Sequence, residues 1–337
     1  MKVIHLRAPG GLDRLELVDL PDPGVPGAGE IRVRLHASSL NYHDLGVVSG
    51  AMSTADRRVP MADGAGVVEA VGAGVDGFRP GDCVVSTFFP DWLDGPPSGD
   101  DFSRVPGDGI DGYAAEVVVR PARAFTHAPK GYSHAEAATL TTAGVTAWRA
   151  LVINGGLQAD ETVLVLGTGG VSIFAVQIAK AMGARVIATS SSDAKLARLR
   201  ALGADHLINY RDTPEWAREV LNVTGGVGVD HAVEVGGAGT LAQSIMATRV
   251  GGHIALIGVL TGAAGPVPTA ALVIRQQRLQ GLVVGSNAHQ VDCVRGMERL
   301  NIRPIIDATF PMEDMAEAFR HQQAGKHFGK ICLDLGG

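Results

Sequence analysis

The chain has 337 residues, of which 46% are hydrophobic and 19% are charged, so it is long enough for two domains and too apolar to be disordered. Its net charge of −6, without any basic tract, excludes nucleic acid as an expected partner. No uninterrupted apolar run reaches the roughly 18 residues of a membrane span, and the N-terminus lacks the apolar block of a signal peptide. The three cysteines have no metal-binding or redox spacing. We expect a cytoplasmic protein that contacts no membrane.

The first part of the chain, to about Phe125, shows short alternating or apolar runs separated by Gly and Pro, which predict strands and tight turns. Examples are EIRVRLHASSL and GYAAEVVVRP. The same alternation extended to Tyr42 and His43 predicts that their side chains point to opposite faces. The Pro-, Gly- and Asp-rich segment from Phe89 to Asp111 predicts either a surface lobe or a lid.

The pattern changes near Ser133, where Ser133 and Glu136 form a predicted capping box at the start of a helical segment. Beyond it, apolar runs alternate with amphipathic segments up to a last apolar run at Leu279–Val284. Strands that alternate with helices predict a doubly wound parallel sheet of the α/β class. After Gly285 come two helical segments and a final strand, which together are too small to form a core. We expect this tail to complete the first domain.

A glycine loop joins the first strand of this alternating region to an apolar-striped helix. Its glycines leave room for a tight turn, for the close approach of a pyrophosphate and for a helix N-terminus that attracts negative charge. Ser172 stands where the third glycine of the dinucleotide fingerprint is expected, and it is small enough to pack closely. We predict that this loop binds a dinucleotide, rather than forming an ordinary strand-to-helix turn, through Gly167, Thr168, Gly169, Gly170 and Val171.

The second strand of the dinucleotide unit ends in hydroxyl residues. NAD sites usually place an acid there to hold the ribose hydroxyls, about 20 residues beyond the first glycine. Here Thr189 and Ser190 occupy that place, and Asp193 follows a predicted N-cap, so it is interpreted as a first-turn helix acid. Hydroxyls and one cation, without a repelling carboxylate, suit the 2′-phosphate of NADP(H), which we favour over NAD(H). The residues concerned are Ser190, Ser191 and Lys195, although a lone helical lysine is more often a solvated charge.

Over essentially its whole length the sequence resembles the medium-chain dehydrogenase/reductase superfamily. The matching blocks, in order, are NYHDL, ADGAGVVEAVGAGVDGFRPGDCV, TTAGVTAWRAL, the glycine loop and LGADHLINY. Among the branches of the superfamily, the chain looks most like the quinone oxidoreductases and enoyl reductases. The resemblance implies a Rossmann dinucleotide-binding domain, residues 126–285, and a mostly β GroES-like catalytic domain, residues 1–125 and 286–337.

The resemblance also allows each zinc position to be checked. Zinc-dependent members carry Cys at the position of Asn41, the His of a Gly-His-Glu triplet at that of Ala62 and, often, Cys at that of Thr142. Asn, Ala and Thr cannot replace the nitrogen, sulfur or carboxylate ligands that zinc requires. The four cysteines of a structural zinc lobe would lie in residues 89–111, which contain none. We expect no metal, since the remaining Asp63 and a nearby histidine do not make a catalytic zinc site.

Further cofactor contacts follow from the resemblance. In related reductases Ser, Lys and Tyr side chains hold the 2′-phosphate, and the matching residues here are Ser190 or Ser191, Lys195 and Tyr210. Taken alone, Tyr210 would more often be a half-buried structural aromatic. Residues after the later strands match stretches that touch the ribose and nicotinamide, although each of their glycines also fits an ordinary turn: Val235, Gly258, Val259, Gly285 and Ser286.

Without zinc, an alkoxide has no Lewis acid to stabilise it, so oxidation of a simple alcohol becomes harder. Reduction of a quinone or an enone needs only hydrogen-bond donors for the charge that develops on oxygen. The catalytic residues we expect near the nicotinamide are Asn41 to position the ligands, Tyr42 to donate a hydrogen bond or a proton, and Thr142. Tyr42 is equally well interpreted as a packing aromatic. His43 has a suitable pKa for proton transfer but is predicted to point away from the face of Tyr42.

These observations predict an NADPH-dependent, zinc-independent reductase of quinones or α,β-unsaturated carbonyls. Two alternatives stay open: an alcohol dehydrogenase acting on a small alcohol or aldehyde, and an NADPH-binding protein with little turnover, as in the lens crystallins of the superfamily. The apolar run Leu279–Val284 is expected at a sheet edge, where it can pair with a second copy. We therefore expect a homodimer.

Overall fold

The computed structural model describes residues 1–336, without the side chains of residues 100 and 101. The chain forms two compact units, one made of Met1–Val145 with the tail that starts at Val284, and the other of Thr146–Val283. It passes from the first unit to the second within the short helix α3 (Val145–Trp148). Among the described residues, no helix combines the length and apolar character needed to cross a membrane.

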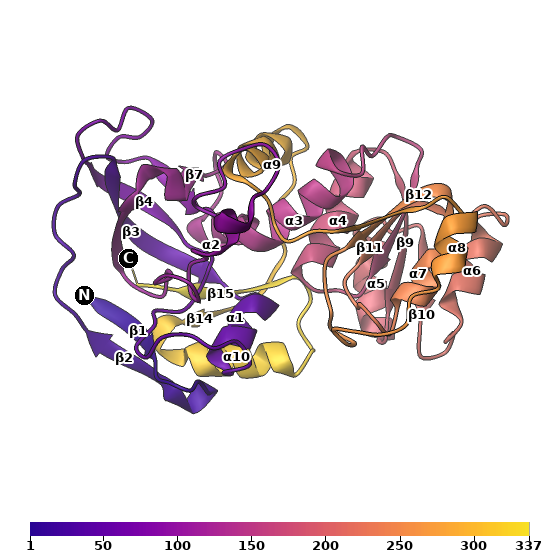
Figure 1. Cartoon of the computed structure of the whole chain (residues 1–337), viewed down its shortest axis with the longest axis horizontal. Coiled ribbons are helices and arrows are strands. Elements are labelled where there is room, and N and C mark those ends of the chain that lie inside the picture. Colours follow the sequence, from indigo (N-terminus) through magenta and orange to yellow (C-terminus); the bar gives the residue numbers. More distant parts are fainter. Residues whose placement is uncertain (337) are drawn as a thin grey trace. The chain divides into compact units, whose positions relative to one another are not determined.

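The first unit is built on a mainly antiparallel sheet of seven strands, in the order β14-β15-β3-β4-β5-β7, with β6 also paired to β3 (Figure 1). Strands β1 and β2 form a separate antiparallel sheet of two strands in the same unit. The strands of this unit are β1 (Lys2–Leu6), β2 (Leu15–Asp19), β3 (Glu30–Ser39), β4 (Ala65–Val71), β5 (Cys83–Ser86), β6 (Val117–Pro121), β7 (Phe125–His127), β14 (Ile306–Pro311) and β15 (Lys330–Asp334). Its helices are α1 (Tyr42–Val48), α2 (His134–Ala138), α9 (Asn287–Arg299) and α10 (Met315–Gln323).

Alternation in β3 sets the core of this unit. Ile31, Val33 and Leu35 are fully buried, while the residues between them are partly exposed, so one face of the strand is apolar. The C-terminal strand β15 pairs antiparallel with β3, and β14 pairs parallel with β15. The C-terminal segment therefore completes the sheet of the first unit, and this part of the expected fold class is confirmed.

The expected alternation at Tyr42 and His43 is wrong, because residues 42–48 form helix α1. Asn41 is its N-cap, and it forms a capping box in which the Asp44 carboxylate accepts a hydrogen bond from the Asn41 backbone at 2.9 Å. Local capping therefore outweighs the β-rich character of the surrounding sequence. Tyr42 and His43 are successive helical residues, about 100° apart around the axis rather than on opposite faces.

The segment 126–145, which the sequence-based domain limits assign to the nucleotide-binding domain, lies in the first unit. Its helix α2 starts at the predicted capping box, since the Ser133 hydroxyl accepts from the Glu136 backbone at 3.2 Å. Ala137 and Ala138 of α2 pack in a small apolar cluster with residues of β3, β4 and β5. Burial of these alanines against the sheet explains why the segment belongs to the first unit.

The second unit is a doubly wound parallel sheet in the order β10-β9-β8-β11-β12-β13, which confirms the Rossmann-type prediction (Figure 1). Helices α6 and α7 cover one face, where Trp216 and Ile245 share an apolar cluster with Leu164 and Ile254. The opposite face carries a further cluster that includes Ala150 and Ala255. The elements are β8 (Thr162–Leu166), α4 (Gly170–Ala181), β9 (Arg185–Ser190), α5 (Asp193–Ala201), β10 (His206–Asn209), α6 (Trp216–Val223), β11 (Val229–Glu234), α7 (Leu241–Ala247), β12 (Thr248–Leu256), α8 (Thr269–Ile274) and β13 (Arg278–Gly281).

The last strand of this sheet is shorter than the predicted run Leu279–Val284. Strand β13 ends at Gly281, and Val284 has a positive φ of 44°, a conformation that interrupts a strand. The strand does lie at the edge of the sheet, next to β12 alone. The preceding helix α8, which the sequence analysis did not predict, exposes Val273 and Ile274.

Candidate active site

The glycine loop lies between the end of β8 and the start of α4. Gly167 has φ of 74°, in the left-handed region that favours glycine, and its N–H donates to the Thr189 carbonyl at 3.0 Å. Neither Gly167 nor Gly169 has a non-neighbouring atom within 4 Å of the place that a Cβ would take. Open space therefore faces the N-terminus of α4, where backbone N–H groups favour an anion.

Ser172 explains the departure from the glycine fingerprint. Its side chain is buried, and its hydroxyl donates to the Leu166 carbonyl at 2.7 Å. The serine thus ties the first turn of α4 to the end of β8. Close packing of helix on strand, which a third glycine would provide, is reached here through a hydrogen bond.

Ser190 ends β9 and is buried, Tyr210 directly follows β10, and Ser191 and Lys195 lie just before and within the first turn of α5. Ser190 is the last residue of β9, and its carbonyl accepts a hydrogen bond from the Tyr210 backbone at 3.1 Å. Ser191 and Lys195 are half-buried, whereas the Tyr210 side chain is exposed. Ser192 is the N-cap of α5, as predicted, and its hydroxyl accepts from the Lys195 backbone at 3.5 Å.

Asp193, the carboxylate closest in sequence to this group, is held by β10. Its Oδ1 accepts a hydrogen bond from the Asn209 side chain at 2.8 Å. The Asn209 Oδ1 in turn accepts from the Arg211 backbone at 3.1 Å, which shapes the turn that carries Tyr210. Asp193 therefore serves a local contact between α5 and β10.

Val235, Gly258 and Val259 lie where β11 and β12 end. A Cβ on Gly258 would overlap the Val235 carbonyl, so the two segments approach too closely for any residue but glycine. Val259 is exposed. Sequence reasoning missed the fully buried Glu234, whose Oε1 accepts from the backbones of Gly236 at 2.7 Å and Gly237 at 3.0 Å. A carboxylate at the end of an apolar strand, just before two glycines, was the available sign of this role.

Gly285 and Ser286 belong to the first unit. Ser286 is buried and caps α9, its hydroxyl accepting from the His289 backbone at 3.2 Å while His289 Nδ1 accepts from the Ser286 backbone at 3.1 Å. A Cβ on Gly285 would press on Val145 and His289. Both predicted residues thus have a clear structural role at the start of α9.

A buried polar cluster gathers two of the predicted catalytic residues. Lys330, at the start of β15, donates from Nζ to the Leu40 carbonyl and to Asn41 Oδ1, each at 2.6 Å, and lies 3.7 Å from Asp63 Oδ2. Asp63 Oδ1 accepts from the Thr142 hydroxyl at 2.6 Å. Lys330 was not predicted, and the only sequence sign of it is a lysine that opens a buried strand.

The cluster is almost free of solvent. Lys330 is 3% exposed and Asp63 is 0% exposed, so this ion pair is inside the unit. Burial raises the pKa of the Asp63 carboxyl, and the Lys330 ammonium opposes that shift. Both polar atoms of the Asn41 side chain have hydrogen-bond partners, since its amide nitrogen also donates to Asp44 Oδ2 at 3.0 Å. Asn41 therefore positions its neighbours, whereas Thr142 is partly exposed.

Tyr42 and His43 differ in their surroundings. Tyr42 is 47% exposed, and its hydroxyl has no hydrogen-bond partner within residues 1–336. His43 Nε2 lies 3.0 Å from Asp108 Oδ2, and Nδ1 lies 3.6 Å from Asp44 Oδ1. Burial acts to lower the pKa of His43, but the two carboxylates outweigh it and raise the pKa to about 10. His43 is thus a charged bridge between α1 and the segment that carries Asp108.

The segment from Phe89 to Asp111, predicted as a lobe or a lid, begins with buried aromatic side chains. Phe89 and Trp92 are 2% exposed each, and Phe89 and Phe102 meet edge to face with ring centres 4.7 Å apart. Trp92 also meets His289 of α9 edge to face. These contacts hold the base of the segment against the first unit.

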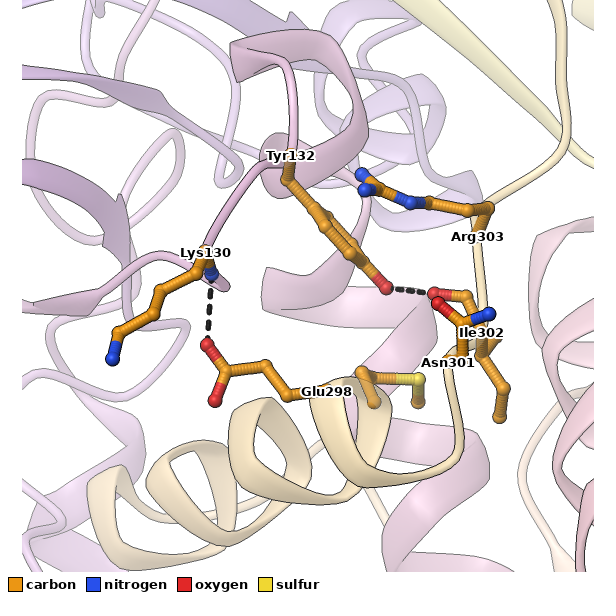
Figure 2. Close-up of a pocket in the computed structure, with 7 residues that line it drawn as sticks. Lys130, Tyr132, Glu298, Asn301, Ile302 and Arg303 are labelled. Atoms are coloured by element: carbon orange, nitrogen blue, oxygen red, sulfur yellow. Dashed lines mark hydrogen bonds between the residues drawn. The ribbon is translucent and has the colours of Figure 1, made fainter.

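A surface hollow on the first unit lies between α9 and the loop before α2 (Figure 2). The Lys130 backbone donates to Glu298 Oε1 at 2.8 Å, and the Tyr132 hydroxyl donates to the Ile302 carbonyl. The Arg303 guanidinium lies 4.7 Å from the centre of the Tyr132 ring. The hollow is therefore a structural junction, and none of the predicted site residues lines it.

Comparison with known proteins agrees with this architecture. Residues 27–130 match the family described as alcohol dehydrogenase GroES-like domain, and residues 170–299 match the family described as zinc-binding dehydrogenase. A zinc-type alcohol dehydrogenase-like protein of Schizosaccharomyces pombe is 42% identical over 96% of both chains. The chain belongs to the medium-chain dehydrogenase/reductase superfamily. It is thus an oxidoreductase of a family that binds NAD(P) and small-molecule substrates.

Solved structures extend the likeness to the fold. The crystal structure of a putative alcohol dehydrogenase from Sinorhizobium meliloti has a TM-score of 0.92 and 43% identity, over 99% of this chain and 98% of that one. The structure of an NAD-dependent alcohol dehydrogenase has a TM-score of 0.90 and 38% identity, over 100% of both chains. This superfamily member is therefore similar to both proteins over essentially its whole length.

Proposed function

We propose that this dehydrogenase/reductase is an NADPH-dependent, zinc-independent reductase that transfers hydride to quinones or α,β-unsaturated carbonyls. The observation that carries the proposal is the buried Lys330 ammonium, which binds Asn41 and faces Asp63. Asn41, Asp63 and Thr142 stand at the positions where zinc-dependent members have ligands or a neighbouring acid. In this chain those residues are bonded to a protein cation and to one another.

The donor set does not fit a zinc ion. Ala62 offers no ligand atom, and Asn41 Oδ1 is already bound to Lys330 at 2.6 Å. A second cation beside the ammonium would be repelled in a site with little solvent to screen it. Within the described part of the chain, no three His, Cys, Asp or Glu side chains form a group that could hold a metal.

The second unit fits a nicotinamide dinucleotide. The loop Gly167–Val171 would hold the pyrophosphate, because open space faces its backbone and the N-terminus of α4. Ser190, Ser191, Lys195 and Tyr210 would hold the 2′-phosphate, which favours NADPH over NADH. The bound cofactor supplies a hydride to the acceptor.

The first unit offers donors for the oxygen of the acceptor. Burial raises the pKa of Tyr42, so its hydroxyl stays protonated and can donate a hydrogen bond to a developing negative charge. Thr142 is the other partly exposed hydroxyl of the predicted catalytic set.

The remaining predicted cofactor contacts come from the ends of later strands and from the start of α9. The residues that would approach the ribose and nicotinamide are Val235, Gly258, Val259, Gly285 and Ser286.

The proposal is tested by mixing the purified protein with a chelator, NADPH and a panel of quinones and enones, and following loss of the reduced cofactor. We expect consumption that the chelator does not reduce and that NADH does not support. A Tyr42→Phe variant should turn over more slowly while its NADPH dissociation constant stays unchanged. Consumption that the chelator abolishes would contradict the zinc-free site.

The names of the relatives favour a second candidate, an alcohol dehydrogenase acting on a small alcohol or aldehyde. One neighbour is described as NAD-dependent, which speaks for NADH. Chelator-sensitive turnover of alcohols with NAD would support this alternative. If NADPH binds but no acceptor or alcohol is turned over, the remaining possibility is a cofactor-binding protein with little activity.

We also propose that the chain forms a homodimer through β13. This strand is one of the two edges of the six-stranded sheet, the other being β10, and unpaired backbone groups at such an edge favour pairing with a second copy. Exposed Val273 and Ile274 on the preceding helix add apolar surface in the same unit. Light scattering should give twice the mass of one chain, and a monomeric mass would contradict the proposal.

A further inference from the structure

Thr142 lies in an unusual stretch of helix. Residues 140–144 form a π-helical turn, in which the Gly144 N–H donates to the Thr139 carbonyl at 3.2 Å. Such turns add one residue to a helix and occur frequently at functional sites. Here the Thr142 hydroxyl donates to the buried Asp63 carboxyl at 2.6 Å, while the Thr142 side chain stays partly exposed. Thr142 thus connects a buried carboxyl to the surface of the unit.

Asp63 has the surroundings of a carboxyl that can hold or release a proton. Besides Thr142, its other oxygen accepts from the Ser39 hydroxyl at 2.6 Å. A hydroxyl can donate to a carboxylate or accept from a carboxylic acid, so both neighbours accommodate either state. Burial favours the neutral acid, while the Lys330 ammonium at 3.7 Å favours the carboxylate. The two influences oppose each other at one side chain.

Lys330 and two further groups act electrostatically on this carboxyl. Lys330 of β15 faces it directly, Asp44 of α1 adds a like charge that favours the neutral form, and the Cys332 thiol of β15 lies within its electrostatic reach. Burial raises the pKa of Cys332 to about 12, so this thiol stays neutral. Lys330 is therefore the cation that compensates Asp63 when its proton leaves.

We propose that Asp63 holds the proton that Thr142 delivers to the reduced acceptor. This inference rests on the proposed function. The β-carbon of the enone takes a hydride, with two electrons, from the reduced nicotinamide, and the electrons of the C=C bond shift toward the carbonyl oxygen to give an enolate. The Thr142 O–H bond breaks as a bond from that hydrogen to the α-carbon of the enolate forms. The Asp63 O–H bond breaks as the threonine hydroxyl is restored, which leaves a carboxylate facing Lys330, and solvent later returns one proton.

The residues have different roles in this relay. In this relay Thr142 is the residue that would touch the acceptor and is therefore the catalytic residue, while Asp63 acts through it. The balance is one enone, one NADPH and one proton giving the saturated ketone and NADP. Because Asp63 must carry the proton, turnover should fall as pH rises through the pKa of this carboxyl.

The test compares turnover of one enone by the intact protein and by matched variants over a range of pH. Thr142→Val keeps the shape but removes the hydroxyl, and we expect kcat to fall about 100-fold, the scale of a lost general acid. Thr142→Ser should restore most of it. Thr141→Val is the matched control, because this neighbour donates to the Ser86 carbonyl and does not touch Asp63, so kcat should stay within about 3-fold.

Asp63→Asn separates a proton-holding role from a structural one. It keeps the size of the side chain but cannot titrate, so the fall of kcat with rising pH should disappear, as should part of the solvent isotope effect. The dissociation constant for NADPH should be unchanged in every variant. A pH profile and isotope effect equal to those of the intact protein would overturn the relay.

A spectroscopic readout is independent of turnover. Infrared difference spectra should show the carbonyl stretch of a protonated carboxyl that titrates with pH, is absent in Asp63→Asn and shifts in Thr142→Val. If Asp63→Asn fails to fold, the comparison of Thr142→Val with Thr142→Ser still tests the relay. Absence of the band overturns the relay whatever the turnover. Absence of turnover in the intact protein overturns the proposed function and the relay with it, whereas turnover with normal Thr142→Val kinetics overturns the relay alone.

Discussion

The polar cluster of the first unit and the glycine loop of the second represent two ways of building a site. In the cluster every group has a partner from the protein itself, and the Asn41–Lys330 hydrogen bond joins residues separated by 289 positions. In the loop, two glycines face open space and all the residues come from one short stretch of chain. The first region is complete before any ligand arrives, while the second offers backbone donors that await an anion.

The largest effect is expected from breaking the completed cluster. Lys330→Met removes the ammonium that binds the Leu40 carbonyl and Asn41 Oδ1 and faces Asp63, and the free energy of unfolding should fall by about 3 kcal/mol or more. Urea denaturation measures the loss. A double variant, Lys330→Met with Asp63→Leu, should recover much of it, because no buried carboxyl then remains without the cation that compensates it. A single variant as stable as the original would show that the ion pair contributes nothing.

The second unit contains a buried group that contrasts with Asp63, because it lacks partners. Both ring nitrogens of His253 are without a hydrogen-bond partner among the described residues, and the side chain is 4% exposed. Burial lowers the pKa of His253 to about 4. The folded protein thus holds it neutral, while the unfolded chain binds a proton below about pH 6.5.

This difference predicts a pH dependence with a definite sign. The stability contributed by neutral His253 is complete above pH 6.5 and is lost progressively as the pH falls toward 4, with a loss of about 2 kcal/mol between pH 7 and pH 5. Unfolding midpoints in urea at pH 7 and pH 5 measure it. His253→Leu should flatten the profile over that interval. An unchanged slope in the variant would assign the dependence to other groups.

A substitution at the proposed dinucleotide site of the second unit should lower the affinity for the cofactor rather than the stability of the fold. Lys195→Ala is expected to weaken NADPH binding about 10-fold, because one charged contact to the 2′-phosphate is lost, and to leave NADH binding unchanged. Fluorescence titration of both cofactors measures the change. Arg200→Ala, on the same helix, is the control and should alter neither constant. Equal losses for NADPH and NADH would place the lysine outside the 2′-phosphate site.

The smallest structural effect is expected at Gly169. Its φ of −76° is open to any residue, and a Cβ there meets nothing within 4 Å, so Gly169→Ala should change stability by less than about 1 kcal/mol. The methyl group would nevertheless occupy the space that faces the helix N-terminus, and NADPH affinity should fall. Gly258→Ala, which overlaps the Val235 carbonyl, should instead destabilise the fold. The reverse order would contradict the assignment of the open space.

The sequence predicts the second region better than the first for a physical reason. Gly167, Ser190 and Lys195 lie within one strand–helix–strand unit, so local spacing determines their neighbours. Lys330 and Asp63 meet because β3 pairs with β15 on one side and, on the other, with β4, which follows Asp63, and no local pattern carries that information. Helix α1 was missed for a different reason, since Asn41 and Asp44 give a local capping signal that the β-rich setting concealed.

The place of Lys330 at the start of β15 has a consequence for synthesis of the protein. A ribosome that has made the first 300 residues has already produced Asn41, Asp63 and Thr142, but not the cation that joins them. During that interval Asp63 can be buried only as a neutral acid, or remain in water as a carboxylate. The first unit therefore closes its polar centre only after its last strand emerges, long after the dinucleotide loop has been able to fold.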